Sequence, residues 1–232
     1  MKPYYEHGGI TIYHGDCRDA LAAVPECDLL LTDPPYGVAW RRTGYSACAP
    51  MVGDVDTTSV LEALQLAIKR LRLSRHAYVF GPLDLSELRL CSVTELVWDK
   101  GGVGVGNLSL PWSTSHERIT FGVRFVGPRQ KANGRGALAA RLRKGSVLRY
   151  QRLYSGQNSR HPTEKPVALL RELIESSSHI GELVLDPFCG SGSTLVAATR
   201  EGRRAIGIEI EERYCEIAAR RLQQEALPLE VA

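Results

Sequence analysis

The fold is decided by the stretch Leu183-Val184-Leu185-Asp186-Pro187-Phe188-Cys189-Gly190-Ser191-Gly192-Ser193-Thr194. An apolar run typical of a strand ends in an acid, and a glycine turn then leads into a segment with helical periodicity. Gly190 and Gly192 allow a ligand to approach the backbone closely, and the helix N-terminus that follows favours a carboxylate or a phosphate. Because no lysine follows the glycines, the turn is not a phosphate loop for ATP.

The next apolar run, residues 205–208, ends in a second acid, Glu209. Its place about 20 residues after the glycine turn is where a ribose diol needs an acceptor. A dinucleotide site would require a third glycine near position 195, where this chain has Leu195. The two acids and the turn together predict a pocket for a ligand that carries a ribose.

Outward from this unit, apolar β-rich runs alternate with segments of helical periodicity, which predicts an α/β protein with a doubly wound, mostly parallel sheet. We expect seven strands, over Ile10–His14, Asp28–Thr32, Ala77–Phe80, Glu95–Trp98, Arg118–Val123, Leu183–Leu185 and Ala205–Ile208. We expect helices over Thr57–Leu73, Pro166–Ser177, Ser193–Glu201 and Glu211–Glu225.

Length and composition fit a single soluble domain with insertions, because the chain has 232 residues, 44% of them hydrophobic and 24% charged. No uncharged apolar run approaches the roughly 18 residues of a membrane span, and the first residues lack the layout of a signal peptide. We therefore expect a cytoplasmic protein. The six cysteines are scattered, without the spacing of metal ligands, so no metal is predicted.

Basic charge is concentrated between Pro128 and Arg160, which hold nine of the 29 Lys/Arg and no Asp or Glu. The rest of the chain then has 20 basic and 26 acidic residues. Such a patch indicates contact with nucleic-acid phosphates, although a solvated cationic loop has the same composition. The predicted contacts are Arg129, Lys131, Arg135, Arg141, Arg143, Lys144 and Arg149, with Tyr150 and Tyr154 available for stacking.

Another predicted strand, Asp28–Thr32, is followed by an acid, two prolines and an aromatic residue, Asp33-Pro34-Pro35-Tyr36. The prolines fix φ and remove two backbone donors, so this corner is rigid and rich in acceptors. Asp33 and the Pro34 carbonyl can each accept an N–H from an amino group, and Tyr36 offers a stacking face. The alternative is a proline-terminated strand with a packed tyrosine.

These two tracts, with His161-Pro162-Thr163-Glu164-Lys165-Pro166 before the second, resemble the β-class DNA amino-methyltransferases. In that family the target-amine motif precedes the cofactor motif, and the target recognition region lies between them. The resemblance implies a Rossmann-like, S-adenosylmethionine-dependent methyltransferase fold with circularly permuted motif order. It assigns residues 1–126 and 161–232 to the two parts of the catalytic domain and 127–160 to the recognition insert.

The resemblance also implies roles for individual residues. Asp33, Pro34, Pro35 and Tyr36 would form the catalytic corner. Glu209 would bind the ribose hydroxyls, Asp16 would meet the adenine of the cofactor, and Lys165 would pair with its carboxylate. The other implied contacts of S-adenosyl-L-methionine are His161, Thr163, Asp186, Pro187, Phe188, Gly190, Gly192 and Thr194. His116 is the only histidine to consider on the side of the flipped base, and a structural role for it is equally compatible with the sequence.

The implied reaction is methylation of adenine N6 in double-stranded DNA, by base flipping and direct in-line transfer. Adenine is favoured because relatives that methylate cytosine N4 more often have Ser in place of Asp33. The alternatives are methylation of cytosine N4, methylation of an amide or amine in RNA or protein, and a regulator that binds DNA without turnover. A homodimer and a cognate restriction endonuclease are further partners that relatives of this class suggest.

Overall fold

The computed structural model describes residues 1–35, 57–102, 109, 111–125, 144–152 and 164–226. Nine strands of this part form one sheet, in the order β1-β2-β9-β8-β3-β4-β6-β5-β7. The strands are β1 (Tyr5–His7), β2 (Ile10–His14), β3 (Cys27–Thr32), β4 (Leu71–Phe80), β5 (Leu90–Asp99), β6 (His116–Arg124), β7 (Val147–Arg149), β8 (Leu183–Asp186) and β9 (Arg204–Glu209). The helices are α1 (Cys17–Ala20), the 3-10 turn η1 (Leu21–Ala23), α2 (Thr57–Arg70), α3 (Val167–Ser177), α4 (Ser193–Arg200) and α5 (Glu212–Ala226).

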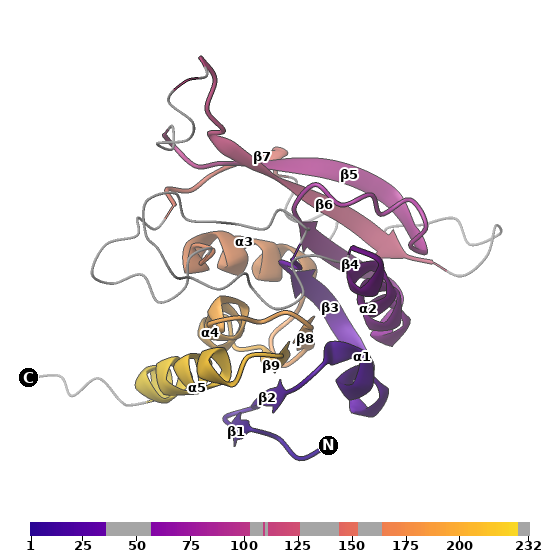
Figure 1. Cartoon of the computed structure of the whole chain (residues 1–232), viewed down its shortest axis with the longest axis vertical. Helices are drawn as coiled ribbons and strands as arrows, with labels where there is room; N and C mark the ends of the chain where they lie inside the picture. The colour runs from indigo at the N-terminus through magenta and orange to yellow at the C-terminus, as the bar shows by residue number, and fades with distance from the viewer. Residues whose placement is uncertain (36–56, 103–108, 110, 126–143, 153–163, 227–232) are drawn as a thin grey trace, which may run out of the picture.

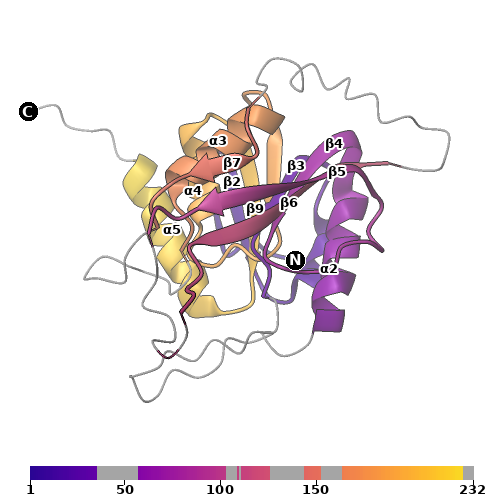
Figure 2. The same ribbon diagram turned by 90° about the horizontal axis from the view of Figure 1, so that it is seen from above.

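Helices cover both faces of the sheet, as Figures 1 and 2 show, with α3, α4 and α5 on one face and α1 and α2 on the other. The leucines of strand β3 pack against the helices of both faces. Leu29 and Leu31 pack with the first helix layer, whereas Leu30 packs with the second. This alternation is the two-residue period of a strand that is buried on both faces. The doubly wound architecture predicted from the sequence is confirmed.

Strands β2, β9, β8, β3 and β4 are mutually parallel, so their carboxyl ends meet at one edge of the sheet. From β8 the chain passes through α4 to β9, and from β3 it passes through α2 to β4, in opposite directions along the sheet. Right-handed crossovers in opposite directions place their helices on opposite faces. The switch point lies between β8 and β3, where open α/β sheets bind ligands.

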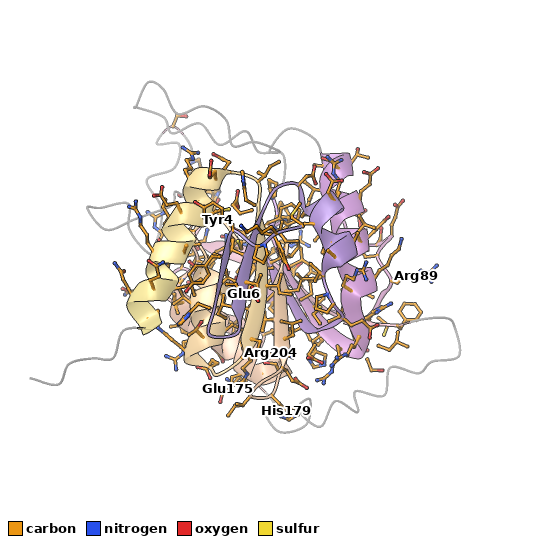
Figure 3. All side chains as sticks on the ribbon, turned by 90° about the horizontal axis from the view of Figure 1, so that it is seen from below. Tyr4, Glu6, Arg89, Glu175, His179 and Arg204 are labelled. Carbon is orange, nitrogen blue, oxygen red and sulfur yellow. The ribbon has the colours of Figure 1, made fainter. Side chains whose placement is uncertain are left out.

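At the opposite edge, formed by the amino ends of these strands, polar side chains bond to neighbouring turns. Figure 3 shows Arg204, the first residue of β9, near the turn that leads into β8. Arg204 Nε donates a hydrogen bond of 3.0 Å to the carbonyl oxygen of Gly181 in that turn.

The sheet is larger than the sequence predicts. All seven predicted strands form, and most of them are longer than the apolar runs that indicate them. Two short strands are added, β1 as an antiparallel edge on β2 and β7 as a parallel partner of β5. Three-residue strands have too little pattern to be recognised locally, because they depend on the neighbour that they pair with. Strand β7 falls within the segment predicted to be the basic insert.

Candidate functional site

The glycine turn at the end of β8 leads directly into α4. Gly192 precedes α4 with a φ of 80°, a left-handed conformation, and no described side chain caps the helix there. A Cβ atom at residue 192 would lie 2.8 Å from the Cβ of Ala218 on α5. Glycine is therefore required by both the backbone conformation and the space. The uncapped N–H groups of the first turn of α4 form a place where a ligand carboxylate can bind.

Asp186 ties this turn to the neighbouring strand. Its carboxylate is buried, and Oδ1 accepts hydrogen bonds from Thr32 Oγ1 at 2.8 Å and from the N–H of Phe188 at 3.2 Å. Burial raises the pKa of Asp186 to about 6, although hydrogen bonds from Thr194, Thr32 and Phe188 oppose the shift. Asp186 thus spans the switch point between β8 and β3.

Two other acids predicted to contact a cofactor hold backbone groups in the structure. Glu209 accepts the N–H of Gly190 at 2.9 Å and the N–H of Glu211 at 2.8 Å, one on each carboxylate oxygen. Asp16 caps α1 by accepting the N–H of Arg18 at 2.8 Å, and the Arg18 guanidinium lies 2.6 Å from its second oxygen. A carboxylate offers about four acceptor positions, so these bonds leave room for ligand hydroxyls on Glu209.

The corner predicted to bind the target amine lies at the end of β3, and its acid, Asp33, is part of an ion-pair network. Lys165 Nζ lies 2.5 Å from Asp33 Oδ2 and 2.9 Å from Glu117 Oε1. Glu117 Oε2 in turn lies 3.0 Å from Lys100 Nζ. The sequence predicts a cofactor carboxylate as the partner of Lys165, whereas the structure surrounds its ammonium with two carboxylates of the protein.

One oxygen of Asp33 lacks a hydrogen-bond donor among the described residues. Asp33 Oδ1 is buried and receives none, whereas both oxygens of Glu117 face ammonium groups, Oε1 that of Lys165 and Oε2 that of Lys100. Burial raises the pKa of Asp33, and the charge of Glu117 raises it further against the opposing ammonium of Lys165. Burial alone would also raise the pKa of Glu117, but the ammonium groups of Lys165 and Lys100 outweigh burial and hold this pKa below its ordinary value.

A buried arginine from α5 joins the glycine turn to the segment before Lys165. Arg221 donates to the carbonyl oxygen of Ser191 at 2.8 Å and to the hydroxyls of Ser191 and Ser193 at 3.1 and 3.2 Å. Its guanidinium also lies 2.7 Å from Glu164 Oε1. The dipeptide Glu164-Lys165 is thus anchored to the glycine turn at one residue and to the target corner at the next.

Sequence reasoning missed the acid on β6. It considered His116, which the structure places on the exposed side of the strand, and passed over Glu117 next to it. Glu117 pairs in register with Trp98 of β5 and shares a strand face with the buried Ile119. An acid in phase with buried residues of its strand is the signal that could have found it, because side chains two positions apart share a face.

Of the predicted DNA contacts, two lie in the described part. Lys144 Nζ lies 3.0 Å from Glu172 Oε1 on α3, and the side chain of Arg149 is 81% exposed, 3.6 Å from Asp99 Oδ2. Tyr150 packs against the core and donates its hydroxyl to Glu172, so it is not free for stacking. The other predicted contacts, and Tyr154, lie outside the described residues: Arg129, Lys131, Arg135, Arg141 and Arg143.

Three residues predicted for the catalytic corner or the cofactor, Tyr36, His161 and Thr163, also lie outside the described residues. The described part contains no group of three or more Cys, His, Asp or Glu placed to hold a metal. No helix of this part is long and apolar enough to cross a membrane.

Comparison with known proteins agrees with this geometry. The N6/N4 methyltransferase family model, described as DNA methylase, matches residues 93–220. The putative methylase YubD of Escherichia coli (strain K12) is 36% identical over 211 residues, covering 90% of this chain and 88% of YubD. The DNA adenine methyltransferase YhdJ of the same organism is 28% identical over 243 residues, covering 91% of this chain and 82% of YhdJ.

Solved structures show the same fold. The M1.HpyAVI–SAM complex superposes with a TM-score of 0.68 and 23% identity, covering 92% of this chain and 98% of that one. The PvuII DNA methyltransferase, which is cytosine-N4-specific, superposes with a TM-score of 0.73 and 16% identity, covering 100% of this chain and 91% of that one.

Proposed function

The chain belongs to the N6/N4 family of DNA methylases, and on that premise we propose that it transfers a methyl group from S-adenosyl-L-methionine to the N6 amine of adenine in duplex DNA. The observation that carries the proposal is Asp33. Its carboxylate lies at the sheet edge beside the Asp186 turn, held through Oδ2 by Lys165, and its buried Oδ1 has no donor among the described residues. An exocyclic amine supplies the N–H donor that this oxygen lacks.

The residues around the glycine turn fit S-adenosyl-L-methionine, which the related M1.HpyAVI structure binds. The uncapped start of α4 would receive the carboxylate of the methionine part, and the free acceptor positions of Glu209 would receive the ribose hydroxyls. Asp186, Pro187, Phe188, Gly190 and Thr194 would shape the rest of the pocket, with Asp16 near the adenine. When bound, the cofactor supplies an electrophilic methyl group on a sulfonium.

The protein's part in the reaction is to hold the amine. The target base has to leave the duplex, because its amino group is otherwise out of reach. Asp33 Oδ1 and the Pro34 carbonyl would then each accept an N–H of the amine. These bonds draw the nitrogen out of conjugation with the ring and orient its lone pair, and positioning of this kind provides much of the rate. Tyr36 would stack on the base.

Direct transfer requires no protein nucleophile, and the cysteine nearest the turn is unsuited to be one. Cys189 is buried, and burial raises the pKa of its thiol well above the ordinary value. A neutral thiol is a poor nucleophile. The chemistry therefore differs from methylation of cytosine C5, which needs a covalent cysteine intermediate.

Adenine is proposed over cytosine because an aspartate, not a serine, occupies position 33, and because the relative YhdJ is named a DNA adenine methyltransferase. The likeness to the cytosine-N4-specific PvuII enzyme supports the alternative, since either target is an exocyclic amine and the same corner accepts both. Contacts with DNA phosphates are proposed for the predicted basic residues, of which Arg149 is the most exposed in the described part. A homodimer and a cognate restriction endonuclease remain predictions.

The test is incubation of the purified protein with tritiated S-adenosyl-L-methionine and mixed-sequence duplex DNA, followed by nucleoside analysis. N6-methyladenosine label is expected. Label in N4-methylcytosine would overturn the base assignment, and no label in DNA despite cofactor binding would overturn the proposed reaction. Asp33→Asn should bind the cofactor normally and lose methyl transfer, whereas loss of cofactor binding in this variant would contradict the role given to Asp33.

A further inference from the structure

A row of alternating charges runs away from the target corner into β6 and β5. In order, it consists of Asp33, Lys165, Glu117 and Lys100, with contacts of 2.5, 2.9 and 3.0 Å between successive charged atoms. All four side chains are at most 22% exposed. The row is neutral as a whole, so the loss of any one member leaves an uncompensated charge in a buried setting.

Aromatic rings support the two cations. Lys165 Nζ lies 5.2 Å from the centre of the Phe80 ring at the carboxyl end of β4, and Lys100 Nζ lies 5.2 Å from the Trp98 ring. Phe80 and Trp98 are themselves almost completely buried. The ammonium groups are therefore held by the core, and they do not have the freedom of ordinary surface lysines.

The row holds both oxygens of Glu117 but only Oδ2 of Asp33, so that Asp33 Oδ1 has no donor among the described residues. A buried acceptor without a donor costs about 1–3 kcal/mol. Apolar residues of similar volume often replace a buried ion pair without loss of stability. A network that serves stability alone therefore has little reason to keep Asp33 Oδ1 buried without a donor from the described residues. The geometry indicates that the network serves a ligand.

We propose that Glu117 is a positioning residue for methyl transfer, which holds the Lys165 ammonium between two carboxylates so that Asp33 keeps Oδ1 open to the target amine. This inference rests on the proposed function of Asp33. If Glu117 lost its charge, Lys165 would keep Asp33 as its one charged partner within this row. Its ammonium would then compete with the amine for the same carboxylate, and Asp33 would become a weaker acceptor.

The decisive variant is Glu117→Gln, which keeps the size of the side chain and removes its charge. The matched control is Glu95→Gln on the neighbouring strand β5, because Glu95 also pairs with a cation, Arg118, but is 51% exposed. For each protein, cofactor affinity would be measured by calorimetry, and kcat with saturating cofactor and DNA would be measured from pH 5 to pH 9.

We expect Glu117→Gln to bind the cofactor like the wild type and to lose about 10- to 100-fold in kcat at pH 8, the scale of a misplaced reacting group. The acid limb of its pH profile should move to lower pH, because the charge of Glu117 no longer raises the pKa of Asp33. A merely structural role would lower stability and leave that limb in place. Glu95→Gln should match the wild type in cofactor affinity, in kcat and in the position of the acid limb.

If the wild type methylates DNA but Glu117→Gln keeps an unchanged kcat and an unchanged acid limb, the proposed function stands and the role given to Glu117 is wrong. A wild type that does not methylate DNA would overturn both. If Glu117→Gln does not fold, the double variant with Lys100→Met removes the matching cation and restores neutrality. A smaller shift of the acid limb to lower pH is expected there, because Glu117 raises the pKa of Asp33 more than Lys100 lowers it, and its absence would be equally decisive. Methylation of cytosine by the wild type would change the substrate and leave this comparison intact.

Discussion

Replacing Asp186 by Asn should stabilise the protein and at the same time weaken its hold on the cofactor. Asp186 is a buried acid whose pKa is raised from 3.8 to about 6, mainly by burial. Above that pH the folded protein keeps an ionised carboxylate in the core, which costs free energy relative to the unfolded chain. The amide oxygen of Asn can still accept the hydrogen bonds from Thr32 and Phe188 that Oδ1 accepts now.

The expected magnitude follows from the shift. A rise from 3.8 to about 6 is roughly two pKa units, or ~3 kcal/mol at 1.36 kcal/mol per unit. Because the folded pKa of this acid is raised, the folded state binds the proton more tightly, and wild-type stability falls as pH rises from about 4 to about 6. Asn does not titrate. The advantage of the variant should thus be ~3 kcal/mol at pH 8 and about half of that at pH 5.

The assay is urea unfolding of wild type and variant at pH 8 and pH 5, with thermal unfolding as a second measure. A gain of ~3 kcal/mol corresponds to a rise in Tm of about 6–12 °C for a chain of this length. The exposed Asp19 provides the control, since Asp19→Asn should change stability by no more than ~0.5 kcal/mol at either pH. If Asp186→Asn were less stable than the wild type at pH 8, or showed the same gap at both values, the reasoning from burial would be wrong.

Three other predictions follow from the site. Gly192→Ala should lower the free energy of unfolding by more than ~2 kcal/mol in urea unfolding and weaken cofactor binding. Its control is Gly181→Ala, because Gly181 has the same φ of 80° but an added Cβ there would meet no atom within 4 Å, so this variant should lose only ~1 kcal/mol. Arg221→Met should cost about 3–5 kcal/mol in the same assay, because it leaves the buried Glu164 without its cation. Arg149→Ala should reduce the slope of log binding constant against log salt for duplex DNA by about 1, and an unchanged slope would exclude this residue as a phosphate contact.

The parts of the fold that could be predicted are those that depend on residues adjacent in the sequence. An apolar strand, an acid and a glycine turn into a helix form a local unit, so residues 183–194 and the corner after β3 lie where the sequence predicts. The doubly wound sheet follows from the alternation of such units. Strands β1 and β7 could not be predicted in this way, because three residues have no periodicity of their own and become strands only through β2 and β5.

The ion-pair network could not be predicted, because its members are far apart in sequence. Lys165 reaches Asp33 across 132 positions, and Glu117 reaches both Lys165 and Lys100 only because β6 turns back antiparallel beside β5. The motifs predict that Asp33 binds the target amine and that Lys165 binds the carboxylate of the cofactor. The pairing of the two residues with each other depends on the sheet order, which places β6 next to β4.

The acids at the carboxyl edge show why residue type alone does not determine a role. Asp186 and Glu209 end their strands and Asp16 follows β2, and each accepts a hydrogen bond from a backbone N–H of the turn or helix that comes next. A chain that leaves a parallel strand has N–H groups without partners, and an acid at that point satisfies them first. Asp33 differs because Pro34 and Pro35 follow it and have no N–H to donate. The two prolines therefore leave one oxygen of this acid without a local partner, and the same local chemistry that occupies the other acids keeps Asp33 available for a substrate amine.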